Sequence, residues 1–284
     1  MPKANTIQPD RKLSILLKGS PGFGKTIAAA SMAVDGPVYL AYYDKNSPVE
    51  LVNFFKKHRP ELLDRIEYDV YSSSNAHEYV NKLFQFQERG CLYIGIITDS
   101  ATTLTSAAVN WSLGFRGKAK KDKDARDRDT PLFIPDFDEY KVETGMVTQI
   151  LDVLRTLPVH NIWTCHPLPK MNIEQSGTRM VITKSNSIVT YGAKVGAMIP
   201  AQFSEVYHFA KESDWSGDGK NKIYVITDQV GDDFAKTNYN LPRKIDITDK
   251  LFWEVMKPLY LGEEVTNEAL IKEEPATPKM PWMK

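Results

Sequence analysis

Eight residues near the start of the chain have the types and the spacing of a loop that holds phosphate groups. The run GSPGFGKT at residues 19–26 fits the pattern G-x-x-x-x-G-K-[ST] at every fixed position. Glycines let such a loop wrap with its amides inward, Lys25 can reach the β- and γ-phosphates of a nucleotide, and the Thr26 hydroxyl can ligate Mg²⁺. The sequence therefore predicts that ATP and Mg²⁺ bind here. The predicted nucleotide-binding residues are Gly19, Ser20, Pro21, Gly22, Phe23, Gly24, Lys25 and Thr26.

The segments on either side of this loop are of the types that it needs. Residues 13–17 are apolar and predict a short buried strand, and residues 27–33 are small and helix-favouring, as in a helix that packs tightly on a sheet. An ordinary glycine-rich turn between a strand and a helix is the alternative. We expect Lys25 to be an exposed charge that serves the phosphates rather than the core.

Further apolar runs predict the strands of a larger sheet, and the amphipathic runs between them predict its helices. Strands that alternate with helices indicate a doubly wound α/β fold with a mostly parallel sheet, whose ligands bind at the carboxyl ends of the strands. The expected strands cover residues 38–43, 66–71, 91–97 and 161–165, and the expected helices cover residues 49–57, 77–89 and 147–157.

The pattern changes in the last third of the chain. Alternating runs at residues 179–183 and 222–227 predict hairpins that extend the sheet in antiparallel fashion toward the C-terminus. We expect an N-terminal extension over residues 1–10, one ATPase domain over residues 11–261, and a flexible, acidic and proline-bearing tail over residues 262–284.

Asp99 follows the apolar run at residues 91–97, downstream of the glycine-rich loop. ATPases with such a loop place a carboxylate at this point to hold Mg²⁺ alongside the loop threonine, here Thr26. The alternative is that Asp99 caps the helix that begins near Ala101. The loop motif favours the metal role.

Two other polar side chains stand where predicted strands end. Asp44 is the nearest candidate for the group that orients or deprotonates the attacking water, with Glu50 as a less favoured candidate. His166 is a candidate sensor of the γ-phosphate. The alternatives are a turn residue for Asp44 and a histidine that satisfies local backbone groups for His166.

Two loops are candidates for contact with single-stranded DNA. One, at residues 190–200, offers glycines, the aromatic Tyr191 for stacking on bases, and Lys194 for a phosphate. The other, at residues 116–128, is basic but has interleaved acids, and a solvated loop is the alternative interpretation. Its candidate contacts are Arg116, Lys118, Lys120 and Lys121.

The order of these features, from the glycine-rich loop to the run FAKTNYNLP at residues 234–242, resembles phage-type P-loop ATPases with a RecA-like core. The resemblance covers most of residues 13–258. It implies a Mg²⁺-dependent ATPase that assists annealing, recombination or replication of single-stranded DNA, beside a single-strand-binding or replication protein, as a homo-oligomer. It also implies a cytoplasmic location, in the host cell if the protein is phage-encoded.

Two positions differ from the pattern of RecA-like enzymes. Asn46 stands two residues after Asp44, where those enzymes place a glutamate base, so we expect slow or DNA-stimulated turnover. Lys236 resembles a lysine that reaches the γ-phosphate of a neighbouring subunit, whereas Asn238 replaces the arginine of that motif. A solvated lysine on a hairpin is the alternative for Lys236.

Composition restricts the classes of partner. The chain has 36 basic and 36 acidic residues in 284, so no global charge attracts it to nucleic acid, and DNA contact must come from a local patch. Cys91 and Cys165 lie at or within apolar runs, which predicts buried thiols in a reducing compartment. No signal core and no membrane-spanning run is found, so we expect no membrane partner.

Two other functions remain open at this stage. One is a nucleotide-dependent switch or loader that acts on a protein partner without holding DNA. The other is a small-molecule kinase, for which the basic run at residues 116–128 resembles a lid, although the antiparallel extension is more than a compact kinase needs.

Overall fold

The apolar runs of the sequence pair into one sheet, because buried backbone groups need hydrogen-bond partners. The computed structural model describes residues 12–44, 48–116, 135, 137–176, 179–213, 221–228 and 235–262, with only the backbone described at residues 115–116, 169–187 and 213. The strands of the sheet are β1 (Ser14–Gly19), β2 (Val38–Tyr42), β3 (Ile66–Val70), β4 (Gly95–Asp99), β5 (His160–Cys165), β8 (Glu205–Ser213), β9 (Asn221–Ile226) and β10 (Lys244–Asp246).

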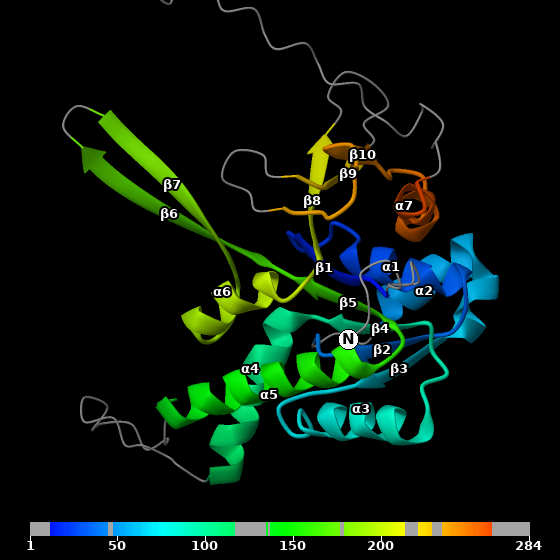
Figure 1. The fold of residues 1–284 in the computed structure, drawn as a ribbon, viewed down its shortest axis with the longest axis horizontal. Helices are drawn as coiled ribbons and strands as arrows, with labels where there is room; N and C mark the ends of the chain where they lie inside the picture. The colour runs from blue at the N-terminus through cyan, green and yellow to red at the C-terminus, as the bar shows by residue number, and fades with distance from the viewer. Residues whose placement is uncertain are drawn as a thin grey trace, which may run out of the picture.

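The order of the strands in this sheet is β10-β9-β8-β1-β5-β4-β2-β3 (Figure 1). β1 pairs in parallel with β5 on one side and with β8 on the other. β9 and β10 then extend the sheet in antiparallel fashion. The predicted α/β class, the mostly parallel sheet flanked by helices and the antiparallel extension toward the C-terminus are confirmed.

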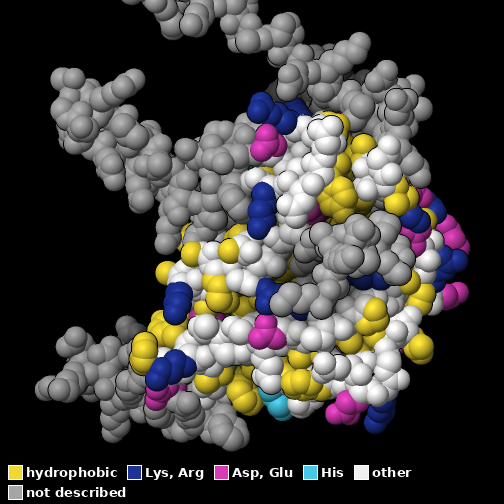
Figure 2. Space-filling model, viewed as in Figure 1, with side chains coloured by type: hydrophobic (Ala, Val, Ile, Leu, Met, Phe, Trp, Pro, Cys, Tyr) yellow, Lys and Arg dark blue, Asp and Glu magenta, His cyan; other side chains and the backbone are white. Residues whose placement is uncertain are grey.

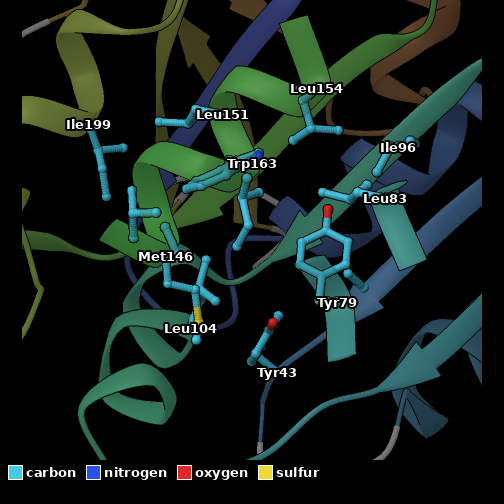
Figure 3. Packing of buried hydrophobic residues seen from close by; sticks show 14 of the residues in the cluster. Tyr43, Tyr79, Leu83, Ile96, Leu104, Met146, Leu151, Leu154, Trp163 and Ile199 are labelled. Carbon is cyan, nitrogen blue, oxygen red and sulfur yellow. The ribbon is translucent and has the colours of Figure 1, made fainter. Parts of the chain in front are cut away.

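Helices cover both faces of the sheet, and alternate residues of each strand face one layer or the other. Leu16 and Trp163 pack beneath the layer of α3, α4, α5 and α6, as Figure 3 shows for Trp163, whereas Leu17 faces α1, α2 and α7. The helices are α1 (Lys25–Ala30), α2 (Val49–His58), α3 (Glu78–Arg89), α4 (Ala101–Arg116), α5 (Phe137–Thr156), α6 (Ala193–Ala201) and α7 (Phe252–Tyr260), with 3₁₀ turns at Ser31–Val34 and Pro60–Arg65.

One hairpin stands apart from the main sheet. β6 (Pro167–Ser176) and β7 (Arg179–Ile188) pair with each other along their whole length and project away from the sheet (Figure 1). The prediction that residues 179–183 extend the main sheet is therefore wrong. The position next to β1 is taken by β8, and the hairpin satisfies its backbone groups internally.

Two boundaries also differ from the sequence-based expectation. The strand expected at residues 91–97 begins only at Gly95, so Cys91 lies before it and is half-buried, whereas Cys165 on β5 is fully buried. Burial raises the pKa of both thiols, that of Cys165 to about 12. The helix expected at residues 147–157 begins ten residues earlier, at Phe137, because its polar first half still buries Glu139 and Glu143.

Within the described residues, no helix is long and apolar enough to cross a membrane.

Candidate functional site

The glycine-rich loop at residues 19–26 connects the end of β1 to the start of α1 at a point where only glycine fits well. Gly22 and Gly24 have φ angles of 77° and 79°, in the left-handed region that side chains disfavour. A Cβ on Gly19 would lie 2.9 Å from the Cβ of Phe209 on β8. The glycines that suggested a phosphate-binding loop are therefore also required by the backbone.

Lys25 is buried at the base of this loop, with 6% of its surface exposed. Its Nζ donates hydrogen bonds to the carbonyl oxygens of Gly19 at 2.8 Å and Ser20 at 3.0 Å. Burial lowers its pKa, and the nearby Cys165 and Asp99 oppose that shift. The expectation of an exposed lysine is wrong, because the loop folds over the ammonium group.

Asp99 ends β4 and is fully buried beside the start of α1. The Thr26 hydroxyl donates to its Oδ2 at 2.8 Å, and the Thr164 hydroxyl donates to its Oδ1. Burial raises the pKa of the Asp99 carboxyl to about 6, while the bonds from Thr164 and Thr26 favour the charged form. The cap contact at the start of α4 comes instead from Ser100, whose Oγ accepts from the Thr103 amide at 3.4 Å. The side chain of Asp99 thus faces Thr26 and Thr164, whereas Ser100 makes the contact expected of a helix cap.

Asp44 follows β2 and faces the first turn of α4. Its Oδ1 accepts hydrogen bonds from Thr103 Oγ1 at 2.9 Å and from Ser100 Oγ at 3.3 Å. These bonds fix the carboxylate at the carboxyl edge of the sheet, where a water that attacks a bound phosphate could be oriented.

His166 follows β5 and makes contacts of two kinds. Its Nδ1 lies 3.2 Å from the Gly19 carbonyl oxygen, and its amide donates to Thr102 Oγ1 at 3.1 Å. Burial lowers its pKa, and the neighbouring Lys25 lowers it further, which favours the neutral ring. His166 therefore satisfies a backbone group of the glycine-rich loop and stands directly before the β6–β7 hairpin.

These side chains line one cavity of about 480 Å³, hereafter the phosphate cavity. It brings together Lys25, Thr26, Asp44, Asp99 and His166, with Glu50 on the wall formed by α2. The chain leaves β1 toward β2 and β3 on one side and later adds β8 on the other, so the cavity lies where the strand order changes direction. Such a point is the usual ligand position in open α/β sheets.

Thr26 and Asp99 have the chemistry of a partial Mg²⁺ site. Both offer oxygen atoms, 2.8 Å apart, which suit a hard cation. In the part of the chain that the structure describes, no group of three or more His, Cys, Asp and Glu side chains could hold a metal. An ion held by these two residues would take its remaining ligands from phosphates and water, as Mg²⁺ commonly does.

Lys236 does not line the phosphate cavity of its own chain. Its backbone forms a bridge with Val206 at the start of β8, with N–O distances of 3.0 and 2.8 Å. The next residue, Thr237, donates a 2.6 Å hydrogen bond to the buried Glu205. The segment is anchored, and a role toward a neighbouring subunit stays a prediction.

Tyr191 and Lys194 lie at the start of α6 and line an open groove along α5, hereafter the α5 groove, of about 1190 Å³. The Tyr191 ring centroid is 6.2 Å from that of Tyr140, and Lys141 Nζ lies 4.5 Å above the Phe137 ring. Figure 2 shows Lys and Arg side chains beside hydrophobic ones at the left ends of α5 and α6. The groove thus combines aromatic rings with two lysines, and it also contains the acidic Glu143 and Asp152.

The other candidate DNA contacts fall outside this description. Lys118, Lys120 and Lys121 lie outside the described residues, and only the backbone of Arg116 is described, as the last residue of α4.

Sequence reasoning missed the threonine and serine hydroxyls around the two carboxylates, those of Ser100, Thr103 and Thr164. Ser100 directly follows the end of β4, which was an available signal, but nothing local in the sequence marks Thr103 or Thr164. No protein-family profile matches the chain, and a search of curated proteins gives no significant match. The case for a function therefore depends on the chemistry of these residues.

Proposed function

We propose that this protein is a Mg²⁺-dependent ATPase with a RecA-like P-loop core. The observation that carries the proposal is the convergence of Lys25, Thr26 and Asp99 on one cavity at the carboxyl ends of β1 and β4. A triphosphate needs a glycine-rich loop, a lysine and an oxygen pair for a metal, and residues 19–26 together with Asp99 offer each of these.

Each residue has a separate part in the proposed hydrolysis. Lys25 exchanges its bonds to the loop carbonyls for bonds to the β- and γ-phosphates, and Asp44 orients the water that attacks the γ-phosphorus. His166 senses the γ-phosphate through its contact with the loop and passes the change to the β6–β7 hairpin. Thr26 and Asp99 would hold Mg²⁺, which would neutralise charge on the phosphates.

We further propose single-stranded DNA as the ligand that responds to the nucleotide. The α5 groove offers Tyr191 and Tyr140 for stacking on bases, with Lys141 and Lys194 for phosphates. The part of its wall that Tyr191 and Lys194 form follows the β6–β7 hairpin directly in the chain. Aromatic and basic residues in one groove are typical of single-strand binding.

The test is release of phosphate from ATP by the purified chain, with and without Mg²⁺ and with and without single-stranded DNA. Hydrolysis that requires Mg²⁺ and increases with DNA supports both parts of the proposal. Hydrolysis unaffected by DNA would favour a switch that acts on a protein partner, and its absence under all conditions would contradict the ATPase assignment.

A shared active site in a homo-oligomer is the remaining part of the proposal. We expect Lys236→Ala to lower ATP turnover severalfold, because in a shared site this lysine would reach the γ-phosphate held by a neighbouring subunit. ATP affinity should not fall, because Lys236 lies outside the cavity of its own chain. Mixing Lys236→Ala with Lys25→Ala subunits should then restore part of the activity. The absence of recovery in verified mixed oligomers would leave a self-contained ATPase.

A further inference from the structure

Thr164 is a buried hydroxyl at the phosphate cavity that the proposed hydrolysis has not used. It is the penultimate residue of β5 and is completely buried. Its hydroxyl donates to Oδ1 of Asp99, while Thr26 donates to Oδ2 of the same carboxylate. The two threonines therefore hold one oxygen each.

The register of the sheet creates this contact. β4 and β5 run parallel with Thr98 opposite Trp163, so the next residues along the strands, Asp99 and Thr164, come to lie side by side. The Trp163 ring packs against Phe203 in the α5 layer, and Thr164, one residue on, faces the phosphate cavity instead. A hydroxyl at this position can reach the carboxylate without any rearrangement of the backbone.

The contact matters because Asp99 has little access to water. A buried carboxylate oxygen that loses its donor bears the full cost of its desolvation. The carboxylate group is then free to rotate, so that this oxygen can take another partner, such as Lys25 or the Thr26 hydroxyl. Outer partners of this kind set the orientation of metal ligands, and their loss typically lowers metal affinity by about 10–100-fold.

We infer that Thr164 is a positioning residue for the metal: it fixes the Asp99 carboxylate so that Oδ2 is presented to Thr26 and to Mg²⁺. The inference rests on the proposed function, since it assumes that Mg²⁺ and a nucleotide bind at this cavity. It goes beyond that proposal because it makes the metal response depend on a residue of β5 that neither contacts the phosphates nor ligates the ion.

The test compares Thr164→Val with the parent protein in binding of a fluorescent ATP analogue, titrated with and without Mg²⁺. We expect affinity without the metal to stay within about twofold, and the Mg²⁺ concentration for half-maximal enhancement to rise about tenfold. Thr164→Ser, which keeps the hydroxyl, should restore the parent response. If Thr164→Val does not fold, Thr164→Ala against Thr164→Ser makes the same comparison.

Thr98→Val is the matched control. Thr98 is a completely buried threonine on the adjacent strand, and its hydroxyl bonds to the Tyr79 hydroxyl at 2.8 Å rather than to Asp99. Both valine variants remove one buried hydroxyl hydrogen bond and should lower the melting temperature to a similar extent. Only Thr164→Val should change the Mg²⁺ response.

Two results would overturn the inference. A Mg²⁺ response of Thr164→Val equal to that of Thr98→Val would show that the hydroxyl does not position the carboxylate, with the proposed function intact. A parent protein whose nucleotide binding does not respond to Mg²⁺ would remove the proposed function and the inference together.

Discussion

The phosphate cavity and the α5 groove are built in opposite ways. In the cavity, of about 480 Å³, Lys25 and Asp99 are 6% and 2% exposed, and hydrogen bonds hold both side chains. In the groove, of about 1190 Å³, Phe137 is 73% and Tyr191 43% exposed. Prearranged buried polar groups suit one ligand of fixed geometry, whereas exposed rings and lysines suit a variable polymer. In the proposed function, the cavity is the site for chemistry and the groove is the surface that contacts DNA.

The strongest test of this difference is Lys25→Ala. We expect it to lower ATP hydrolysis by at least about 100-fold, because the phosphates lose a preorganised cation in a buried site. DNA binding by the α5 groove in the absence of nucleotide should stay within about twofold. Phosphate release and fluorescence anisotropy of a labelled oligonucleotide measure the two effects.

Lys211→Ala is the control for the charge change, since Lys211 is exposed on β8 and lines neither region. Hydrolysis by folded Lys25→Ala at the parent rate would contradict the role of the cavity. An equal loss of both activities would contradict the separation of the two regions.

Asp99→Asn tests whether Mg²⁺ acts only at the phosphate cavity and not at the α5 groove. We expect Mg²⁺-dependent hydrolysis to fall about 10–100-fold, because the ion loses a charged ligand, while nucleotide binding without metal changes little. Removing Mg²⁺ with EDTA from the parent protein should reproduce the loss of hydrolysis without affecting the groove. Equal losses of nucleotide binding with and without Mg²⁺ would indicate that Asp99 has only a structural role.

The α5 groove should respond to changes that leave the cavity unaffected. We expect Tyr191→Ala to weaken binding of single-stranded DNA by about tenfold, through the loss of base stacking. Lys141→Ala with Lys194→Ala should flatten the dependence of log affinity on log salt concentration by about 1.4, from two phosphate contacts at about 0.7 each. The matched control is the pair Lys211→Ala and Lys222→Ala, outside the groove. An unchanged salt slope in the groove variant would place the DNA surface elsewhere.

Acid should affect the stability of the whole fold rather than one of the two regions. His160, the first residue of β5, accepts a 3.1 Å hydrogen bond from the Leu13 amide at Nδ1, and burial lowers its pKa from 6.5 to about 4. A histidine whose pKa is lowered in the folded protein contributes its full stabilisation at pH values above its unfolded-state pKa of 6.5. It loses that contribution as the pH falls toward 4. The loss between pH 7 and pH 5 is at most about 2 kcal/mol.

The measurement is the melting temperature of the parent and of His160→Gln at pH 7 and pH 5. We expect the parent to lose more stability on acidification than the variant, while both hydrolyse ATP at similar rates at pH 7. A parent that is equally stable at both pH values would contradict the assignment of a neutral, partly buried His160.

The parts of the site that the sequence located are those with a local signature. The left-handed turns at Gly22 and Gly24 require glycine wherever the loop occurs, and Asp99 follows directly from the end of an apolar strand. Thr103 and Thr164 have no such signature, since their partners lie 59 and 65 residues away in the chain. The burial of Lys25 was also missed, because it depends on how the loop closes over the side chain.

The sequence by itself determined the α/β class, the parallel core with its antiparallel extension, and the place of the glycine-rich loop between β1 and α1. Periodicity and glycine placement act over a few residues, so they can be read along the chain. Only the tertiary structure decided that β8 rather than the β6–β7 hairpin lies beside β1, and that Thr26 and Thr164 share the two oxygens of Asp99. Those outcomes depend on strand order and register, which are fixed by packing between segments far apart in the sequence.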